Sequence, residues 1–251
     1  MSGDIRFHAT ERDGICTIQF DHPPSRNALD RATRVELVAR LQAADADPAV
    51  RAIVLTGADP SFTSGVDAKQ LLADPDYVAP SIDPPTALRA LQTPTIAAVN
   101  GACVSGGLEI ALACSFVLAS SGAVFADTHA KLGLTPGWGL SVELPAAIGV
   151  RRARQMTLTG HPIDAETAER WGLVNELVPP HLLLARAREI GLATAELDPR
   201  SIANAVSLYR ETQEAQLGAA RDVERRRLTQ WQVDRSAATR SFRQSVSPPS
   251  T

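Results

Sequence analysis

Short apolar runs and helical periodicities alternate through the first half of the chain. Runs typical of buried strands lie at residues 15–20, 52–55, 95–99, 116–119 and 123–125. Between the first two, Asp30 is a candidate N-cap for a helix that carries Val35, Val38 and Leu41 on one face. Strands that alternate with helices in this way predict an α/β domain.

The pattern changes near residue 140, where strand-like runs become rare. Residues 73–86, which hold four Pro and three Asp, predict a loop before that point, either a lid or a plain surface loop. After it, helical periodicity covers residues 141–148, 151–158, 164–171, 182–196 and 202–242, with one extended stretch at 173–177. We therefore expect an α/β core over residues 1–195 and a helical region over residues 196–251 whose end is frayed. The residues show no strong internal repeat.

The composition is that of a globular protein with a sizeable core. Of the 251 residues, 44% are hydrophobic and 21% are charged, so stability requires neither disulfides nor a structural metal. The net charge of −3 gives no reason to expect a nucleic acid partner. Residues 200–251 carry nine Arg and five acidic residues, a net charge of +4. This excess indicates a solvent-facing helix, or a surface for an anionic ligand or a neighbouring subunit.

The cysteines and the N-terminus bear on the cellular compartment. Cys16, Cys103 and Cys114 are odd in number and form no C-x-x-C pair, and the N-terminus has no secretory signal. No apolar run reaches the roughly 18 residues of a membrane span. We therefore expect a soluble, cytoplasmic protein with no membrane partner.

The most informative stretch is residues 100–114, where an apolar strand leads through Gly106 and Gly107 into an apolar helix. The glycines let a ligand approach the backbone, and free N–H groups at a helix start favour negative charge. Glu109 is the one charged residue of that helix. A buried carboxyl group has a raised pKa, which suits a general acid or base, although a paired structural glutamate also fits the pattern.

A second group of backbone donors is expected at residues 61–67. Asp67 can cap the following helix and leave the N–H of Val66 free to point into a cleft. Two N–H groups directed at one point would form an oxyanion hole. The sequence contains no P-loop, no G-x-G-x-x-G and no G-x-S-x-G motif, and its five His do not cluster at metal-ligand spacing. We expect no metal site and no cofactor.

Several segments, in order along the chain, resemble the crotonase superfamily of enoyl-CoA hydratases and isomerases. The matching pieces are residues 26–29, 62–67, 93–109, 125–139 and 158–174. The resemblance implies an α/β fold, a crotonase-like spiral of repeated ββα units with a helical C-terminal region that helps form a homotrimer or a dimer of trimers. It also implies an acyl-CoA thioester ligand. The carbonyl oxygen of this ligand would lie between the N–H groups of Val66 and Gly106, which stabilise an enolate.

The resemblance further implies which residues contact the substrate. Arg26, Ala28 and Ser64 match family positions near the nucleotide and pantetheine of CoA, with Arg26 facing phosphate. Trp138 is expected beside the acyl group, either as packing or as a binding residue. The other positions expected at the substrate are Gly65, Asp67, Gly107 and Pro136.

Two glutamates flank the double bond in the hydratases of this family. Glu109 matches the first, whereas the second aligns with His129. An imidazolium at His129, kept charged by Asp127 on the same strand face, would donate a proton to Cα while Glu109 activates water. The leading hypothesis is thus an enoyl-CoA hydratase. The alternatives are an isomerase with Glu109 as its one base, another crotonase reaction such as thioester hydrolysis or C–C cleavage, and a non-catalytic acyl-CoA-binding protein.

Overall fold

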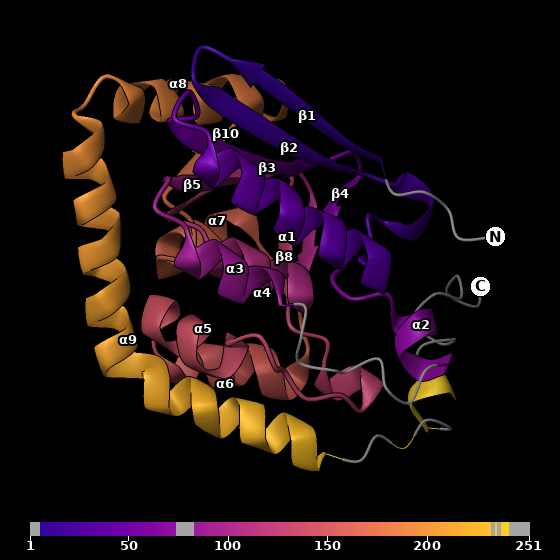
Figure 1. Cartoon of the computed structure of the whole chain (residues 1–251). Coiled ribbons are helices and arrows are strands. Elements are labelled where there is room, and N and C mark those ends of the chain that lie inside the picture. The colour runs from indigo at the N-terminus through magenta and orange to yellow at the C-terminus, as the bar shows by residue number, and fades with distance from the viewer. Residues whose placement is uncertain (1–5, 74–82, 232–233, 235–236, 241–251) are drawn as a thin grey trace.

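The computed structural model describes residues 6–73, 83–231, 234 and 237–240 and arranges their strands in two sheets (Figure 1). The larger sheet has six strands in the order β1-β2-β3-β5-β7-β10. Its first two strands are antiparallel, and the others continue in parallel. The bounds are β1 (Arg6–Arg12), β2 (Ile15–Asp21), β3 (Ala52–Gly57), β5 (Thr95–Val99), β7 (Phe116–Ser120) and β10 (Glu176–Val178).

The smaller sheet repeats the order of the larger one. Its four strands, in spatial order, are β4 (Ser61–Thr63), β6 (Ala102–Val104), β8 (Val124–Ala126) and β9 (Ile163–Asp164). Three of them directly follow a strand of the larger sheet, since β4 follows β3, β6 follows β5 and β8 follows β7. Each pair leads into a helix, namely α2 (Ala68–Ala73), α4 (Gly106–Ala113) or the short 3-10 helix η2 (Ala130–Leu132). These successive units confirm the predicted fold of repeated ββα units.

The repeat brings three turns to one edge of the smaller sheet. β4 pairs with β6 and β6 pairs with β8, both in parallel. Parallel neighbours end at the same edge, which is where α/β proteins place their ligands. The turns after these strands, residues 64–67, 105–107 and 127–129, therefore lie side by side.

Helices cover both faces of the larger sheet. On one face, Val54 and Ile96 pack with Ala187 of α8, and on the other, Leu55 shares the largest hydrophobic cluster with Leu37 of α1. All of β3 is buried, as expected for a parallel strand covered on both sides. The helices not yet given are α1 (Arg31–Ala46), α3 (Pro84–Ala90), α5 (Leu140–Ile148), α6 (Val150–Thr159), α7 (Ala165–Trp171), α8 (Leu183–Ala195), α9 (Pro199–Gln230), η1 (Pro23–Ser25) and η3 (Pro180–Leu182).

The start of α1 agrees with the prediction, but its buried face does not. Asp30 caps the helix by accepting a 2.8 Å hydrogen bond from the N–H of Thr33. Val35, expected on the inner face, is 48% exposed. The buried side instead carries Arg34 and the residues Thr33, Leu37, Leu41 and Ala44. The predicted inner face was wrong because it was chosen from apolar residues, whereas one of the inward positions of α1 is an arginine.

Two other boundaries differ from the prediction. Residues 74–82 of the expected loop lie outside the described part of the chain, but residues 84–86 form the first turn of α3, which Asp83 caps through the N–H of Thr86 at 3.0 Å. Proline is tolerated there because the first N–H groups of a helix need no partner within it. The helix expected to reach residue 242 ends at Gln230, after which Trp231 is extended, and the described residues 237–240 are helical again. The expected frayed tail, residues 243–251, lies outside the described residues.

Candidate active site

Hydrogen bonds and close packing hold the three turns together. The N–H of Ser105 donates to the carbonyl oxygen of Ala126 at 2.8 Å, and the N–H of Thr128 donates to Oγ of Ser105 at 2.9 Å. Gly65, at φ +82°, packs so closely that a Cβ there would lie 2.7 Å from the amide nitrogen of Gly106. The turns after β4, β6 and β8 thus form one continuous wall.

The first two turns place two backbone donors beside each other. The amide nitrogen of Val66 lies 3.2 Å from the position that a Cβ of Gly106 would occupy. The peptide groups around Val66 are fixed, because the N–H of Leu29 donates to Gly65 and the N–H of Asp67 donates to Leu29, at 2.7 and 3.0 Å. The structure therefore brings the predicted oxyanion-hole residues together, as the stabilisation of an enolate requires. That a carbonyl oxygen binds there stays a prediction.

Glu109 is buried in the first turn of α4, with 3% of its surface exposed. Its Oε1 accepts hydrogen bonds from the N–H groups of Trp138, at 2.9 Å, and Leu140, at 3.3 Å. Its Oε2 lies 4.0 Å from Nε2 of His129. Burial raises the pKa of Glu109 to about 7, against the lowering effect of His129 and of the two N–H groups. The carboxyl group thus has one anchored oxygen and one that faces the imidazole.

His129 lies between Glu109 and Asp127. Its Nδ1 is 2.8 Å from Oδ1 of Asp127, which is fully buried. Burial lowers the pKa of His129, but the hydrogen bond with Asp127 and the charges of Glu109 and Asp127 outweigh it, so the pKa is raised. The predicted contact between Asp127 and His129 is present. However, β8 ends at Ala126, so both residues lie in the turn after the strand rather than on its face.

Trp138 covers the start of α4. Its ring carbon Cζ3 would lie 3.1 Å from a Cβ placed on Gly106, and the guanidinium of Arg34 stacks 5.9 Å from the ring centroid. Its carbonyl oxygen accepts a 3.3 Å hydrogen bond from Nη1 of Arg89. Contacts on three sides fix this half-buried residue next to the predicted oxyanion hole.

The segments expected to bind CoA also lie together. The N–H of Ser64 donates to the carbonyl oxygen of Arg26 at 3.0 Å, and Arg26 is exposed with a left-handed backbone. Ala28 is buried beside them. Asn27, which the sequence analysis passed over, binds the carbonyl groups of three residues of the β3–β4 connection (Ala58, Ser61 and Phe62, at 2.8, 2.7 and 3.2 Å). The position of this asparagine in the matched segment 26–29 is the feature of the sequence that could have indicated this role.

Three of the other expected substrate positions have described local surroundings. A Cβ on Gly107 would lie 2.4 Å from the carbonyl oxygen of Thr63, so glycine is needed there for packing against β4. Asp67 caps α2, as predicted, through the N–H groups of Lys69 and Gln70 at 2.8 and 3.1 Å. Pro136 is half-buried in the segment before α5. Contact of these residues with substrate stays a prediction.

The sequence analysis also missed Glu224 of α9. Its Oε1 accepts a 2.6 Å hydrogen bond from the N–H of Gly139, and its Oε2 accepts one of 2.7 Å from the N–H of Ser141. The basic excess of residues 200–251 predicts a solvent-facing helix, so the buried position of this acidic residue was not expected. Residues 221, 224, 228 and 231, spaced by three or four, were the pattern that could have revealed an inward face.

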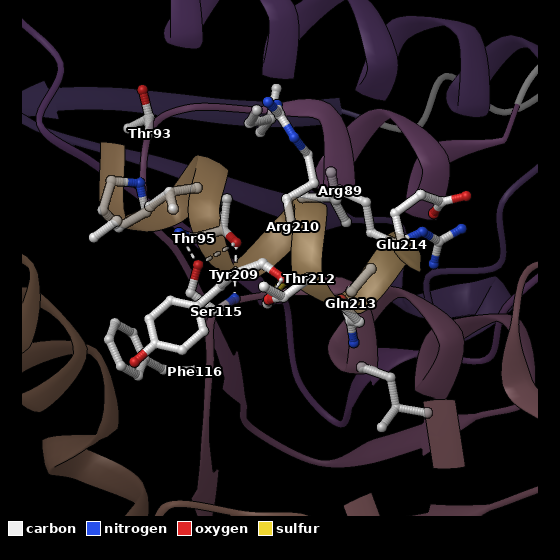
Figure 2. A pocket seen from close by; sticks show the side chains of 18 of the residues that line it. Arg89, Thr93, Thr95, Ser115, Phe116, Tyr209, Arg210, Thr212, Gln213 and Glu214 are labelled. Atoms are coloured by element: carbon white, nitrogen blue, oxygen red, sulfur yellow. Dashed lines mark hydrogen bonds between the residues drawn. The ribbon is translucent and has the colours of Figure 1, made fainter. Parts of the chain in front are cut away.

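A separate cavity of about 670 Å³ lies between α9 and the core (Figure 2). Its described lining includes Tyr209 and Gln213 of α9, Thr95 of β5 and Arg89 of α3, and it includes neither Glu109 nor His129. Arg89 also donates to the carbonyl oxygen of Trp138, whose N–H group binds Glu109, so the cavity and the candidate active site share a neighbour in Arg89.

The described residues also bear on metal binding and on membrane insertion. Within residues 6–73 and 83–231 and the few described beyond them, no group of three or more His, Cys, Asp or Glu side chains is placed to hold a metal ion. Over the same described part of the chain, no helix has the length and apolar character needed to cross a membrane.

Comparison with known proteins places this site in a family. The family model for enoyl-CoA hydratase/isomerase matches residues 10–244. A protein of Arabidopsis thaliana named "Probable enoyl-CoA hydratase 1, peroxisomal" is 37% identical over 219 residues, 86% of this chain and 83% of that one.

Solved structures agree. An enoyl-CoA hydratase from Mycobacterium avium has a TM-score of 0.84 and 38% identity, over 91% of this chain and 97% of that one. A monofunctional enoyl-CoA isomerase from M. smegmatis has a TM-score of 0.72 and 34% identity, over 86% and 96% of the two chains. The chain belongs to the enoyl-CoA hydratase/isomerase family of the crotonase superfamily.

Proposed function

We propose that the protein is an enoyl-CoA hydratase, which adds water across the double bond of a 2-enoyl-CoA thioester. The observation that carries this proposal is the placement of Glu109. One of its oxygens is fixed by two backbone N–H groups, and the other lies 4.0 Å from Nε2 of His129. A buried carboxylate opposite an imidazole whose side chain is 12% exposed, beside two backbone donors, can supply a base, an acid and enolate stabilisation.

The reaction requires two proton transfers. The Glu109 carboxylate takes a proton from water while the water oxygen bonds to Cβ, and the electron pair of the double bond moves to the thioester oxygen. The N–H groups of Val66 and Gly106 stabilise this enolate. The imidazolium of His129 then donates its proton to Cα. Transfer of the proton from Glu109 back to His129 restores the starting state.

The protonation states needed at the start are supported by the surroundings of the pair. Hydration begins with His129 protonated and Glu109 ionised. The contact with Asp127 favours the proton on His129, whose pKa is raised despite its burial. The pKa of Glu109, raised by burial to about 7, suits a group that accepts and releases a proton near neutral pH.

Isomerisation is the second candidate, because the chain is also similar to a monofunctional enoyl-CoA isomerase. In that reaction Glu109 alone would remove a proton from one carbon and return it to another, while His129 only orients the ligand. Thioester hydrolysis, C–C cleavage or binding without turnover are the possibilities left if neither reaction occurs.

The wider setting of the site is part of the same proposal. The substrate class is acyl-CoA, with Arg26 near the phosphates and no cofactor besides the CoA thioester itself. The helical C-terminal region would form a homotrimer or a dimer of trimers in the cytoplasm. Exposed apolar residues on α9, Leu208 at 59% and Tyr209 at 78%, support a subunit contact there. Light scattering of the purified protein measures the oligomeric state.

The test follows the loss of conjugated enoyl-thioester absorbance when the protein meets short and medium 2-enoyl-CoAs. We expect Glu109→Gln to lower kcat by about 10²- to 10⁴-fold, and His129→Ala to lower it by at least about 10²-fold. His161→Ala, at an exposed histidine, is the matched control and should retain full activity.

The outcomes separate the candidates. Turnover that needs Glu109 but not His129 would assign His129 a supporting role. No loss of absorbance with 2-enoyl-CoA, but turnover of 3-enoyl-CoA, would replace the hydratase with the isomerase. Acyl-CoA binding without either reaction would overturn both.

A further inference from the structure

One face of α9 lies along residues 133–143, the segment whose N–H groups bind the carboxylate of Glu109. Trp231 donates from Nε1 to the carbonyl oxygen of Gly133 at 2.9 Å, and Leu228 packs directly on Gly137. Glu224 binds the N–H groups of Gly139 and Ser141. Further back on the same face, Arg221 and Gln213 bind the carboxylate of Glu143 at 2.8 Å each. The second half of α9 thus follows residues 133–143 from end to end (Figure 1).

The N-terminus of α5 is held by two carboxylates in alternation. The first N–H groups of a helix have no partner within it, and Gly139, the N-cap residue at φ +109°, has no side chain to accept from them. Glu109 accepts from residues 138 and 140, and Glu224 accepts from residues 139 and 141. The Oγ of Ser141 also donates to Glu224. Four consecutive N–H groups are therefore shared between the predicted catalytic base and a residue of the C-terminal helix.

Glu224 is itself held firmly. It is 6% exposed, and the ion pair between Arg221 and Glu143, with exposures of 8% and 5%, fixes the helix turn next to it. Removing one member of a buried pair leaves an uncompensated charge, so this contact resists separation of α9 from α5. The carboxylate of Glu224 is fixed relative to α5 and not carried on a loose helix.

We propose that Glu224 is a positioning residue for Glu109, acting through the backbone of residues 138–141. By binding the N–H groups of Gly139 and Ser141, it orients the N–H groups of residues 138 and 140, which alternate with them, toward Oε1 of Glu109. That leaves Oε2 as the oxygen that faces His129 and the reacting water. The proposal rests on the proposed function, in which Glu109 is the base.

The same arrangement gives Glu224 an electrostatic effect on the pair. The charged groups around Glu109 are His129 in the turn after β8, Arg89 on α3 and Glu224 on α9. The negative charge of Glu224 raises the pKa of Glu109, in addition to the larger effect of burial. It also raises the pKa of His129. Removing this charge should lower the pKa of both groups.

The experiment compares Glu224→Gln and Glu224→Ala with Glu211→Gln, an equal loss of charge at an exposed position of α9. We expect Glu224→Ala to lower kcat by about 100-fold with KM changed less than about twofold, because the base is misplaced while Val66 and Gly106 are untouched. Glu224→Gln, which keeps the volume and one acceptor, should lower kcat by about tenfold. It should also move the acid limb of the pH–kcat profile to lower pH. Glu211→Gln should match the wild type.

A measurement without turnover completes the test. The pKa of His129, followed by NMR titration of the imidazole in the whole protein, should be lower in Glu224→Gln than in Glu211→Gln. If folded Glu224 variants keep the wild-type kcat, pH profile and His129 titration, the inference is overturned. If the wild type turns over no 2-enoyl-CoA, the proposed function fails, and the His129 titration still decides whether Glu224 acts on this pair.

Discussion

The oxyanion half and the acid–base half of the site are built in different ways. The oxyanion half consists of the N–H groups of Val66 and Gly106, in turns that follow directly paired strands of one small sheet. The acid–base half consists of side chains, and the backbone that anchors Glu109 is bound in turn by Glu224, whose hydrogen bonds to it span 83 and 85 residues of sequence. The oxyanion half depends on the packing of two neighbouring strands, and the acid–base half depends on side-chain contacts that extend to the C-terminal helix.

This difference determines which changes each half tolerates. Backbone donors do not depend on the identity of their own side chains, so the oxyanion half responds mainly to added volume between β4 and the start of α4. The acid–base half depends on the position and charge of a few buried groups, so it responds to substitutions on α9, a helix that contains none of the expected substrate positions. Variants of the two halves should therefore differ in how they change kcat/KM, the free energy of unfolding and the pH dependence of kcat.

Among variants that leave Glu109 and His129 in place, the largest effect is expected for Gly107→Ala, which adds volume to the oxyanion half. The new Cβ would lie 2.4 Å from the carbonyl oxygen of Thr63, so β4 must move away from α4. We expect kcat/KM to fall by about 10²- to 10³-fold, the cost of losing one oxyanion-hole donor. The free energy of unfolding should fall by about 1–3 kcal/mol.

Gly122→Ala is the control for that substitution. The nearest atom to its new Cβ would be Oγ of Ser120 at 3.9 Å, an ordinary contact. Steady-state kinetics and urea unfolding of both variants measure the effect. Wild-type kcat/KM in Gly107→Ala would show that the two turns do not need their close approach.

A smaller effect, mainly on stability, is expected for Arg221→Met in the support of the acid–base half. The substitution leaves the buried carboxylate of Glu143 without its partner at 2.6 Å, which should lower the free energy of unfolding by about 3 kcal/mol. Arg186→Met removes a comparable contact to Glu176, but both of those side chains are about 40% exposed, so little change is expected. Equal urea midpoints for the two variants would contradict a buried support for α5.

The same division separates what the sequence could predict from what it could not. Strands β2, β3, β5 and β7 of the larger sheet and residues Val66, Gly106 and Glu109 follow from local patterns of apolar residues, glycines and a lone charge, whereas β1 was not predicted. The three-residue strands β4 and β6 are too short for a period of two to be recognised, and this is why the residues show no strong repeat although the fold repeats. The spacing of residues 221, 224, 228 and 231 could mark Glu224 as facing inward, but its partners Gly139 and Ser141 could not be predicted, because they lie at the start of another helix.

The smallest effect is a change of pH profile in Asp127→Asn, within the acid–base half. Burial lowers the pKa of His129 and the contact with Asp127 raises it, so loss of the carboxylate should lower this pKa and move the basic limb of the kcat profile to lower pH. His129 lowers the pKa of Glu109, and a less protonated His129 lowers it less. The acid limb, expected near pH 7 in the wild type from the Glu109 pKa of about 7, should therefore move to higher pH. The bell-shaped pH profile of kcat should therefore narrow from both sides, while the maximal kcat falls only a few-fold. An unmoved basic limb would mean that His129 is not the acid, and Glu109 would then act alone, as in the isomerase.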